Sequence, residues 1–410
     1  MPVLEAASDK LLAELGAARA ESDRLFEVLT QDAMYERPIA ERHRVIFYLG
    51  HLDAFDWIQI CREALGQKSR DPGLDDLFQA GIDPDSTDLP KDTAADWPSL
   101  RQVSTYVERC RKQVDDSLHG ASSDAVEMAL EHRLMHLETL AYMFHNFRLN
   151  LKRTPRGYRH GVTAGSVRDN PWREIPAGEA ILGKPKDGSF GWDNEYEQVR
   201  QSTPRFRVQQ FPVSNGEYLG FVRDGGTMPH FWSARGDRIF YRGMFEEIPL
   251  PLDWPVYATQ HDAQSYAKWL GRDLMTESQF DRAAYGALSS DGDRPFPWGP
   301  APPSHGHGNF DFKHWDPESI YATPDGDSSF GVSQLIGNGW EWTSTPFAPF
   351  PGFEARASYP GYSANFFDDK HYVLKGGSPR TAARLLRRSF RNWFRRDYPY
   401  VYAKFRCVEN

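Results

Sequence analysis

The sequence predicts two domains, the first entirely helical and the second of mixed α+β class with much loop. Apolar residues recur at helical spacing through residues 1–155. Beyond about residue 165, short apolar runs alternate with Gly, Pro, Asp and Asn. A chain of 410 residues is long enough for each domain to bury its own core. We therefore expect a helical bundle at 1–155, a linker at 156–165 and a second domain at 166–410.

Four helices are expected in the first domain. The second helix follows Pro38, which breaks the preceding segment. The fourth follows Ser122, a residue type that caps helix N-termini. The polar residues between the second and third helices predict a long connection at 66–96. The apolar spacing places the helices at 11–29, 45–65, 97–118 and 123–149.

The second domain is expected to consist of short strands, many loops and a helix or two. The clearest helical pattern covers residues 262–287. Elsewhere the apolar runs are too short for helices, and turn-forming residues separate them. No internal repeat is evident.

Three histidines in the helical half form a candidate metal site. His132 and His136 lie four residues apart, so on a helix they share a face and are about 6 Å apart along the axis. His51, on another expected helix, could supply a third ligand. Three neutral imidazoles with open positions suit a reactive first-row metal. The same spacing also arises in helices where histidines serve only in packing.

Glu138 follows closely but has a different helical phase. It lies two residues beyond His136, which turns it about 200° away around the helix. We therefore expect Glu138 to support the site from outside the ligand set, or to be structural, rather than to bind a metal.

Composition excludes several classes of partner. A net charge of −9 gives no reason to expect nucleic acid. No run of about 18 apolar residues is present, so we expect no membrane span. The N-terminus lacks the pattern of a signal peptide. The three cysteines are far apart and form no CxxC motif, which is typical of a reducing compartment. We expect a cytoplasmic protein.

The second half carries phrases that resemble the formylglycine-generating-enzyme fold, a variant of the C-type-lectin-like fold. The resemblance spans about residue 165 to the end and implies that fold. Formylglycine generation is not expected, because that family uses a pair of nearby cysteines and this segment holds Cys407 alone. The phrases occur in the family's order: Val213-Ser214-Asn215-Gly216-Glu217-Tyr218, Trp269-Leu270-Gly271-Arg272, Gly337-Asn338-Gly339-Trp340-Glu341-Trp342, Lys375-Gly376-Gly377-Ser378 and Phe405-Arg406-Cys407.

The first half is similar to DinB-type four-helix bundles, whose metal site consists of three histidines. A DinB-like bundle followed by this lectin-like domain resembles the EgtB, OvoA and SenA family of sulfoxide and selenoxide synthases. The family motif HxxxHxE is matched by His132, His136 and Glu138, and its earlier histidine by His51. The resemblance implies a non-haem Fe(II) site. It also implies use of O2 to join sulfur or selenium to C2 of a histidine imidazole.

The resemblance also implies residues for substrate binding and proton transfer. Asn392 would hydrogen-bond the substrate hercynine (Nα-trimethylhistidine), and Trp393 would face its trimethylammonium group, since aromatic faces attract quaternary ammonium. Trp393 could equally be ordinary core. A proton donor is expected from the loop before Gly376, where both Tyr359 and Tyr362 remain open.

Departures from the family pattern bear on the sulfur or selenium donor. Actinobacterial relatives hold γ-glutamylcysteine with an Asp and an Arg where this chain has Phe394 and Tyr398. They also have a Gln that contacts hercynine where this chain has Met135. These changes disfavour γ-glutamylcysteine and leave cysteine or a selenosugar. An aromatic, hydroxylated patch suits a sugar, so we favour the selenoneine-forming branch.

Three classes of function remain. The favoured one is an Fe(II)- and O2-dependent synthase acting on hercynine, with the ergothioneine-type reaction on cysteine as its nearest alternative. Histidine itself could also be the acceptor, as in the OvoA branch. The second class is a DinB-like thiol transferase that uses a metal but no O2. The third is a binding module whose histidines hold metal only incidentally.

Overall fold

The computed structural model describes residues 7–81, 89–163, 165–287 and 294–410. By their contacts these residues divide into two compact units, Met1–Tyr158 and Arg159–Asn410. Residues 82–88 of the expected connection and Ala164 of the expected linker lie outside the described residues. In the described part of the chain, no helix is both long enough and apolar enough to cross a membrane.

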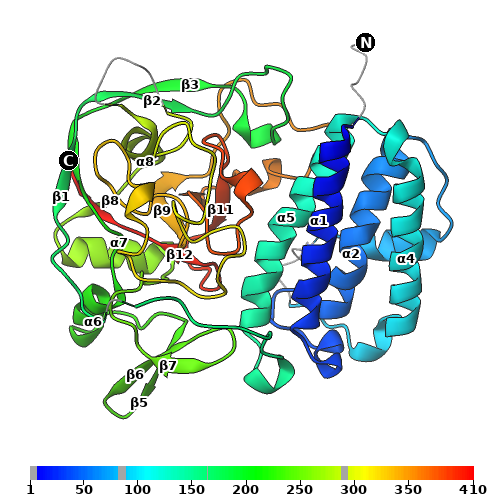
Figure 1. The fold of residues 1–410 in the computed structure, drawn as a ribbon, viewed down its shortest axis with the longest axis horizontal. Coiled ribbons are helices and arrows are strands. Elements are labelled where there is room, and N and C mark those ends of the chain that lie inside the picture. The colour runs from blue at the N-terminus through cyan, green and yellow to red at the C-terminus, as the bar shows by residue number, and fades with distance from the viewer. Residues whose placement is uncertain (1–6, 82–88, 164, 288–293) are drawn as a thin grey trace. The chain divides into compact units, whose positions relative to one another are not determined.

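The first unit is a bundle in which α1 runs beside α5 and α2 beside α4 (Figure 1). Serines begin three of the long helices: the side chains of Ser8, Ser99 and Ser122 each accept a hydrogen bond from a main-chain N–H of the first turn. The helices are α1 (Asp9–Glu27), α2 (Val45–Trp57), α3 (Pro72–Gln79), α4 (Leu100–Ser117) and α5 (Ser123–His145).

Helix α2 is the central helix of the bundle. Every residue of α2 except Leu49 is buried, including the polar residues His51, Asp53 and Asp56. It continues into a π-helical segment, η2 (Ile58–Ala64), so the expected second helix is present but changes its winding after Trp57.

The expected loop at 66–96 is wrong in part, because it contains helix α3. Asp71 caps α3 by accepting from the main-chain N–H of Leu74, and Pro72 opens its first turn. The helix has eight residues, too few for an apolar periodicity to stand out in a polar segment.

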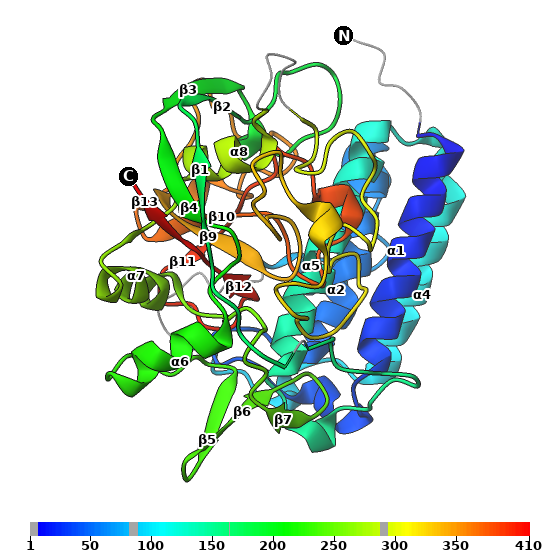
Figure 2. The same cartoon turned by 60° about the vertical axis from the view of Figure 1, so that its left-hand side comes forward.

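The second unit contains four sheets among its described residues (Figures 1 and 2). Two have four strands each, in the orders β1-β4-β13-β8 and β11-β10-β9-β12. The others are the hairpin β2-β3 and the three-stranded β5-β6-β7. Helix α8 packs against β2, β9 and β10. The strands are β1 (Trp172–Ile175), β2 (Gly178–Leu182), β3 (Val199–Thr203), β4 (Phe206–Gln209), β5 (Trp232–Arg235), β6 (Arg238–Arg242), β7 (Glu247–Pro249), β8 (Asp273–Leu274), β9 (Trp340–Pro346), β10 (His371–Lys375), β11 (Asn392–Arg395), β12 (Ala403–Lys404) and β13 (Cys407–Glu409).

The helical pattern expected at 262–287 is present as two helices with a short strand between them. The segment forms α7 (Gln260–Trp269), the short strand β8 and α8 (Glu277–Tyr285), after α6 (Asn215–Arg223) earlier in the unit. Gly271 has a φ of 71°, which an L-residue with a side chain adopts reluctantly, and it ends the first helix. Thr276 then caps the second helix together with Gln279.

A buried ionic cluster lies in the core of the second unit. Arg406 donates to both carboxylate oxygens of Glu341, at 2.8 and 3.2 Å, and Lys404 lies 3.4 Å from the same carboxylate. Burial alone would raise the pKa of Glu341, but the two cations hold it below its usual value. Cys407 is buried beside this cluster on β13, and burial raises the pKa of its thiol. The predicted fold class, a helical bundle followed by an α+β domain, is confirmed.

Candidate functional site

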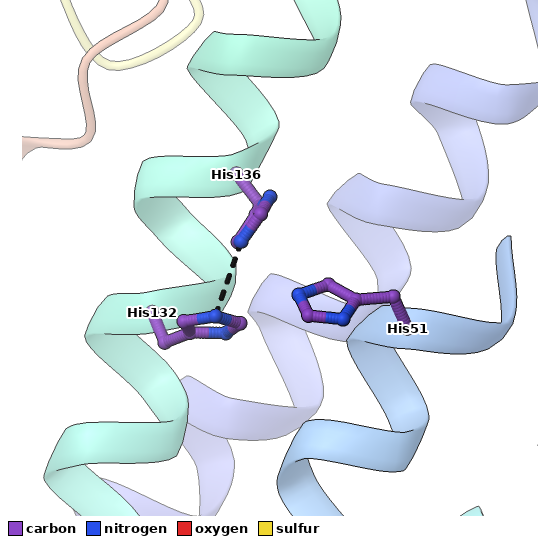
Figure 3. A group of neighbouring side chains, drawn as sticks. All are labelled: His51, His132 and His136. Atoms are coloured by element: carbon purple, nitrogen blue, oxygen red, sulfur yellow. Dashed lines mark hydrogen bonds between the residues drawn. The ribbon is translucent and has the colours of Figure 1, made fainter. Parts of the chain in front are cut away.

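The structure brings the three predicted histidines together inside the bundle. His51 comes from α2 and the other two from adjacent turns of α5 (Figure 3). One nitrogen of each ring lies within 4.8 Å of the others, and no other group of His, Cys, Asp or Glu in the described ranges is arranged closely enough to hold a metal. Their exposed fractions are small: His51 4%, His132 3% and His136 5%.

The pair on α5 has the spacing of two ligands on one ion. The Nε2 atoms of His132 and His136 are 3.1 Å apart (Figure 3). Two imidazole nitrogens bound at about 2.1 Å to a common metal lie about 3.0–3.4 Å apart, depending on the coordination angle. The i, i+4 spacing on the helix therefore produces a ready pair of donor atoms.

His51 is held in the tautomer that a metal ligand needs. Its Nδ1 donates a hydrogen bond of 2.7 Å to the carbonyl oxygen of Phe78. Because a carbonyl can only accept, the proton lies on Nδ1 and Nε2 carries a lone pair. That Nε2 is buried and has no hydrogen-bond partner in the described part of the chain. A metal ion would satisfy it.

Burial keeps all three rings neutral. It lowers the pKa of His51 to about 4, although the bond to Phe78 acts in the opposite direction. Burial likewise holds the pKa of His132 and that of His136 well below the usual value, and repulsion from neighbouring histidines adds to this effect. At neutral pH, metal binding would not have to displace a proton from any of the three.

Two phenylalanines wall the cluster. Phe47 stacks on His51 with ring centroids 5.0 Å apart, and Phe55 stacks on His132 at 3.4 Å. Neither was predicted from the sequence, although each lies four residues from His51 and so shares its helix face. The rings restrict the histidines and exclude water.

A buried ion network holds α5 against α2 next to the histidines. Arg133 donates to Asp53 at 2.8 Å and to Asp56 at 2.7 Å. It also donates to Ser22 at 2.9 Å. Burial alone would raise the pKa of Asp53, but Arg133 and Arg111 hold it below its usual value. Since Arg133 directly follows His132, this network sets how His132 faces α2.

Glu138 and Met135 lie on α5 outside the histidine cluster. Glu138 is buried, and its carboxylate is not among the grouped donor atoms. Met135 is half-buried. Both positions agree with their helical phase.

In the second unit, Tyr362 and Trp393 belong to one aromatic cluster. The Tyr362 ring meets Trp393 edge-on at 5.3 Å and stacks on Trp192 at 4.1 Å. Phe347 stacks on the indole of Trp393, with ring centroids 4.3 Å apart. Tyr359 lies 6.0 Å from Tyr362 and extends the cluster. The sequence offered no sign that the tryptophans contact this loop, because the segments are distant along the chain.

The strand β11 carries Asn392 and Trp393, expected to bind hercynine, and Phe394, expected near the sulfur or selenium donor. All three lie on β11, where successive side chains point to opposite faces. Asn392 accepts a hydrogen bond from the main-chain N–H of Trp393. Phe394 instead stacks on Tyr398 at 5.1 Å, and Tyr400 meets Tyr398 edge-on at 5.1 Å. Trp393 and Phe394 thus belong to two different aromatic groups.

The arginines near this segment are ion-paired inside the unit. Arg391 donates to both oxygens of Glu277, at 2.8 and 3.0 Å. Arg387 donates to Glu195 at 2.8 Å, and Arg388 donates to Asp281 at 3.2 Å. These three guanidinium groups are therefore committed to carboxylates of the fold.

Comparisons with known proteins match the two halves of the chain to two different families. Residues 172–410 match the sulfatase-modifying factor enzyme 1-like domain, and residues 14–146 match the DinB superfamily. "Hercynine oxygenase" of Mycolicibacterium thermoresistibile is 31% identical, over 80% of this chain and 78% of the relative.

"Ergothioneine biosynthesis protein 1" of Neurospora crassa is 29% identical, over 94% of this chain and 56% of the relative. The chain thus spans about half the length of that fungal relative. Among solved structures, PvdO of Pseudomonas aeruginosa gives a TM-score of 0.42 at 18% identity, covering 58% of this chain and 94% of PvdO.

Three findings agree. The bundle is DinB-like and holds a histidine cluster, the second unit matches the sulfatase-modifying factor, and a hercynine oxygenase is matched over most of both chains. The chain belongs to the EgtB and OvoA family of ergothioneine-synthase-type enzymes.

Proposed function

We propose that this chain is a non-haem Fe(II)- and O2-dependent synthase that forms a C–Se or C–S bond at imidazole C2 of hercynine. The observation that carries the proposal is the buried cluster of three neutral histidines in a member of this family. Family membership supports the acceptor, because one relative is named a hercynine oxygenase.

The proposed reaction, rather than the donor set, favours iron over zinc, because three imidazoles can hold either metal. Three imidazoles leave further coordination positions open, and the neutral ligands suit a first-row transition metal. When bound, Fe(II) would supply the redox chemistry and O2 activation that bond formation at the unreactive C2 carbon requires, and zinc has no comparable redox change. Phe47 and Phe55 would keep bulk water away from the ligands.

Residues of the second unit would bind hercynine and supply a proton. The indole of Trp393 would face the trimethylammonium group, an attraction of about 1–2 kcal/mol when both partners are desolvated. Asn392 would hydrogen-bond the substrate. Tyr362 or Tyr359 would donate a proton through its phenol.

The donor pocket is proposed to accept a selenosugar. Phe394 and Tyr398 stack on each other, and neither carries the charge that a γ-glutamylcysteine carboxylate or amine would need. A sugar ring packs well on such aromatic surface, and a tyrosine hydroxyl can hydrogen-bond it. Cysteine is the competing donor, and the names of the relatives favour the sulfur reaction.

Product analysis tests the proposal. The protein is reconstituted anaerobically with Fe(II), then given air, hercynine and either 1-selenoglucose or cysteine, and the products are read by mass spectrometry. A hercynine adduct with the selenosugar supports the full proposal. An adduct with cysteine alone would assign the ergothioneine-type reaction. Absence of any adduct and of O2 uptake would overturn the synthase and leave a thiol transferase without O2 chemistry.

A further inference from the structure

A hydrogen bond to a main-chain carbonyl joins helix α3 to His51, the proposed metal ligand on α2. The carbonyl oxygen of Phe78 accepts the Nδ1 proton of His51 at 2.7 Å. Phe78 is the second-last residue of α3, so its carbonyl has no partner within the helix and is available to accept. The negative end of the helix dipole thus points at the imidazole that would face the metal.

The position of that carbonyl depends on close packing between Phe78 and Gly50. The Phe78 side chain is fully buried. A Cβ atom added to Gly50 would lie 2.5 Å from the Phe78 ring, far inside van der Waals contact. Only a residue without a side chain, one position before His51, lets the ring approach α2 this closely.

Contacts with α4 also hold α3 in place. Tyr106 donates to Asp75 at 2.7 Å, and Arg109 donates to Asp71 at 3.0 Å. The rings of Phe78 and Tyr106 are 5.4 Å apart. Helix α3 is therefore fixed at both its capping residue and its middle.

We propose that α3 is a clamp for the metal ligand His51, in which Phe78 and Gly50 are positioning residues. The Phe78 carbonyl fixes the tautomer and orientation of the imidazole, and the ring seated on Gly50 keeps the carbonyl in reach. Partners of this kind, one step outside the ligands, typically change metal affinity 10- to 100-fold when lost. The inference rests on the proposed function only through its metal site.

The test measures Co(II) binding to the full chain, which needs no turnover. Gly50→Ala should weaken Co(II) about 10-fold or more in competition with a chelator. It should also change the visible absorption bands of the bound ion, because the orientation of His51 changes. Gly50→Ala/Phe78→Leu, which makes room for the added methyl, should recover most of the affinity and the wild-type bands.

A matched glycine on α3 provides the control. A Cβ atom at Gly73 would meet no atom within 4 Å, so Gly73→Ala should leave Co(II) affinity and spectrum as in wild type. Should Gly50→Ala fail to fold, Tyr106→Phe loosens α3 without touching α2 and should weaken Co(II) several-fold.

The outcomes separate the clamp from the metal site itself. If wild type binds no Co(II), or His51→Ala binds it as tightly as wild type, the proposed metal site fails. If His51→Ala loses Co(II) while folded Gly50→Ala or Tyr106→Phe keeps wild-type affinity and bands, the metal site stands and the clamp is wrong.

Discussion

Among single residues, we expect Trp393 to distinguish hercynine from histidine. Its indole lies between Phe347 and Tyr362, which fix its plane. Loss of the ring removes an attraction of about 1–2 kcal/mol for the quaternary ammonium, so Trp393→Leu should raise KM for hercynine about 10-fold. The ring attracts the trimethylated nitrogen most strongly, so KM for histidine should change less.

Steady-state kinetics with both acceptors checks this expectation. Trp269→Leu, which removes an indole that is 45% exposed on α7, serves as the control and should leave both KM values unchanged. Equal losses for hercynine and histidine in Trp393→Leu would show that Trp393 is core rather than a cation binder.

The two tyrosines of the loop differ in their surroundings. Tyr362 is packed between Trp192 and Trp393, whereas Tyr359 lies at the edge of this cluster. We expect Tyr362 to be the proton donor, so Tyr362→Phe should lower kcat about 100-fold with little change in KM for hercynine. Tyr359→Phe is the matched control and should keep its kcat. A loss of kcat in Tyr359→Phe but not in Tyr362→Phe would make Tyr359 the proton donor.

Among elements, the contact between α2 and α5 depends on the buried charge of Arg133. Arg133→Met would leave Asp53 and Asp56 without their common partner inside the bundle. Breaking one side of a buried ion pair typically costs about 3–5 kcal/mol, so the free energy of unfolding should fall by that amount.

Urea unfolding followed by the helical circular dichroism signal measures the loss. Arg24→Met removes a guanidinium that is 63% exposed and paired with Glu21 on the surface of α1, and should change the free energy by less than about 1 kcal/mol. Equal effects of the two substitutions would mean that the network around Arg133 does not hold the helices together.

The neutral histidines make the metal-free bundle sensitive to acid. Their pKa values are lowered in the folded chain, whereas unfolded histidines have a pKa of about 6.5. Below pH 6.5 the unfolded chain therefore takes up protons that the folded chain does not. The free energy of unfolding that depends on a neutral His51 is therefore fully present above pH 6.5. It is lost as the pH falls toward about 4, the pKa of His51 in the folded chain.

A difference measurement isolates this effect from other titrating groups. Between pH 7 and 5.5, each such histidine costs about 1.3 kcal/mol. With a chelator present, wild type should therefore lose about 1.3 kcal/mol more unfolding free energy than His51→Leu over this range. If the unfolding free energies of wild type and His51→Leu changed equally with pH, His51 would be protonated in the folded bundle.

For the whole molecule, the sequence predicted what local spacing encodes. The i, i+4 pair His132 and His136, the apolar helical spacing and the Ser122 cap are local patterns, so the helical bundle and the histidine pair could be predicted. The place of His51 in the cluster and the fold of the second domain were expected from the family resemblance. Helix α3 could not be predicted, because eight residues are too short for a periodicity. The split of 262–287 depends on the φ of Gly271, which the apolar pattern does not reveal.

Other parts of the site depend on contacts that cannot be predicted from residue types. The partner of His51 is the main-chain carbonyl of Phe78, and every residue has a carbonyl. The separation of Trp393 from Phe394 follows from their alternation on β11, which becomes visible only when the strand is known. The contact between Tyr362 and Trp192 joins segments far apart in sequence.

We expect one iron, held by His51, His132 and His136, to be required for chemistry on hercynine. The most direct test measures bound Fe(II) per chain and hercynine product per chain in the same anaerobically loaded, then aerated, samples. Wild type should bind one Fe(II) and form product, and His132→Ala should lose both. Product from an iron-free His132→Ala sample would show that the iron is not required, and full Fe(II) binding by that variant would show that His132 is not a ligand.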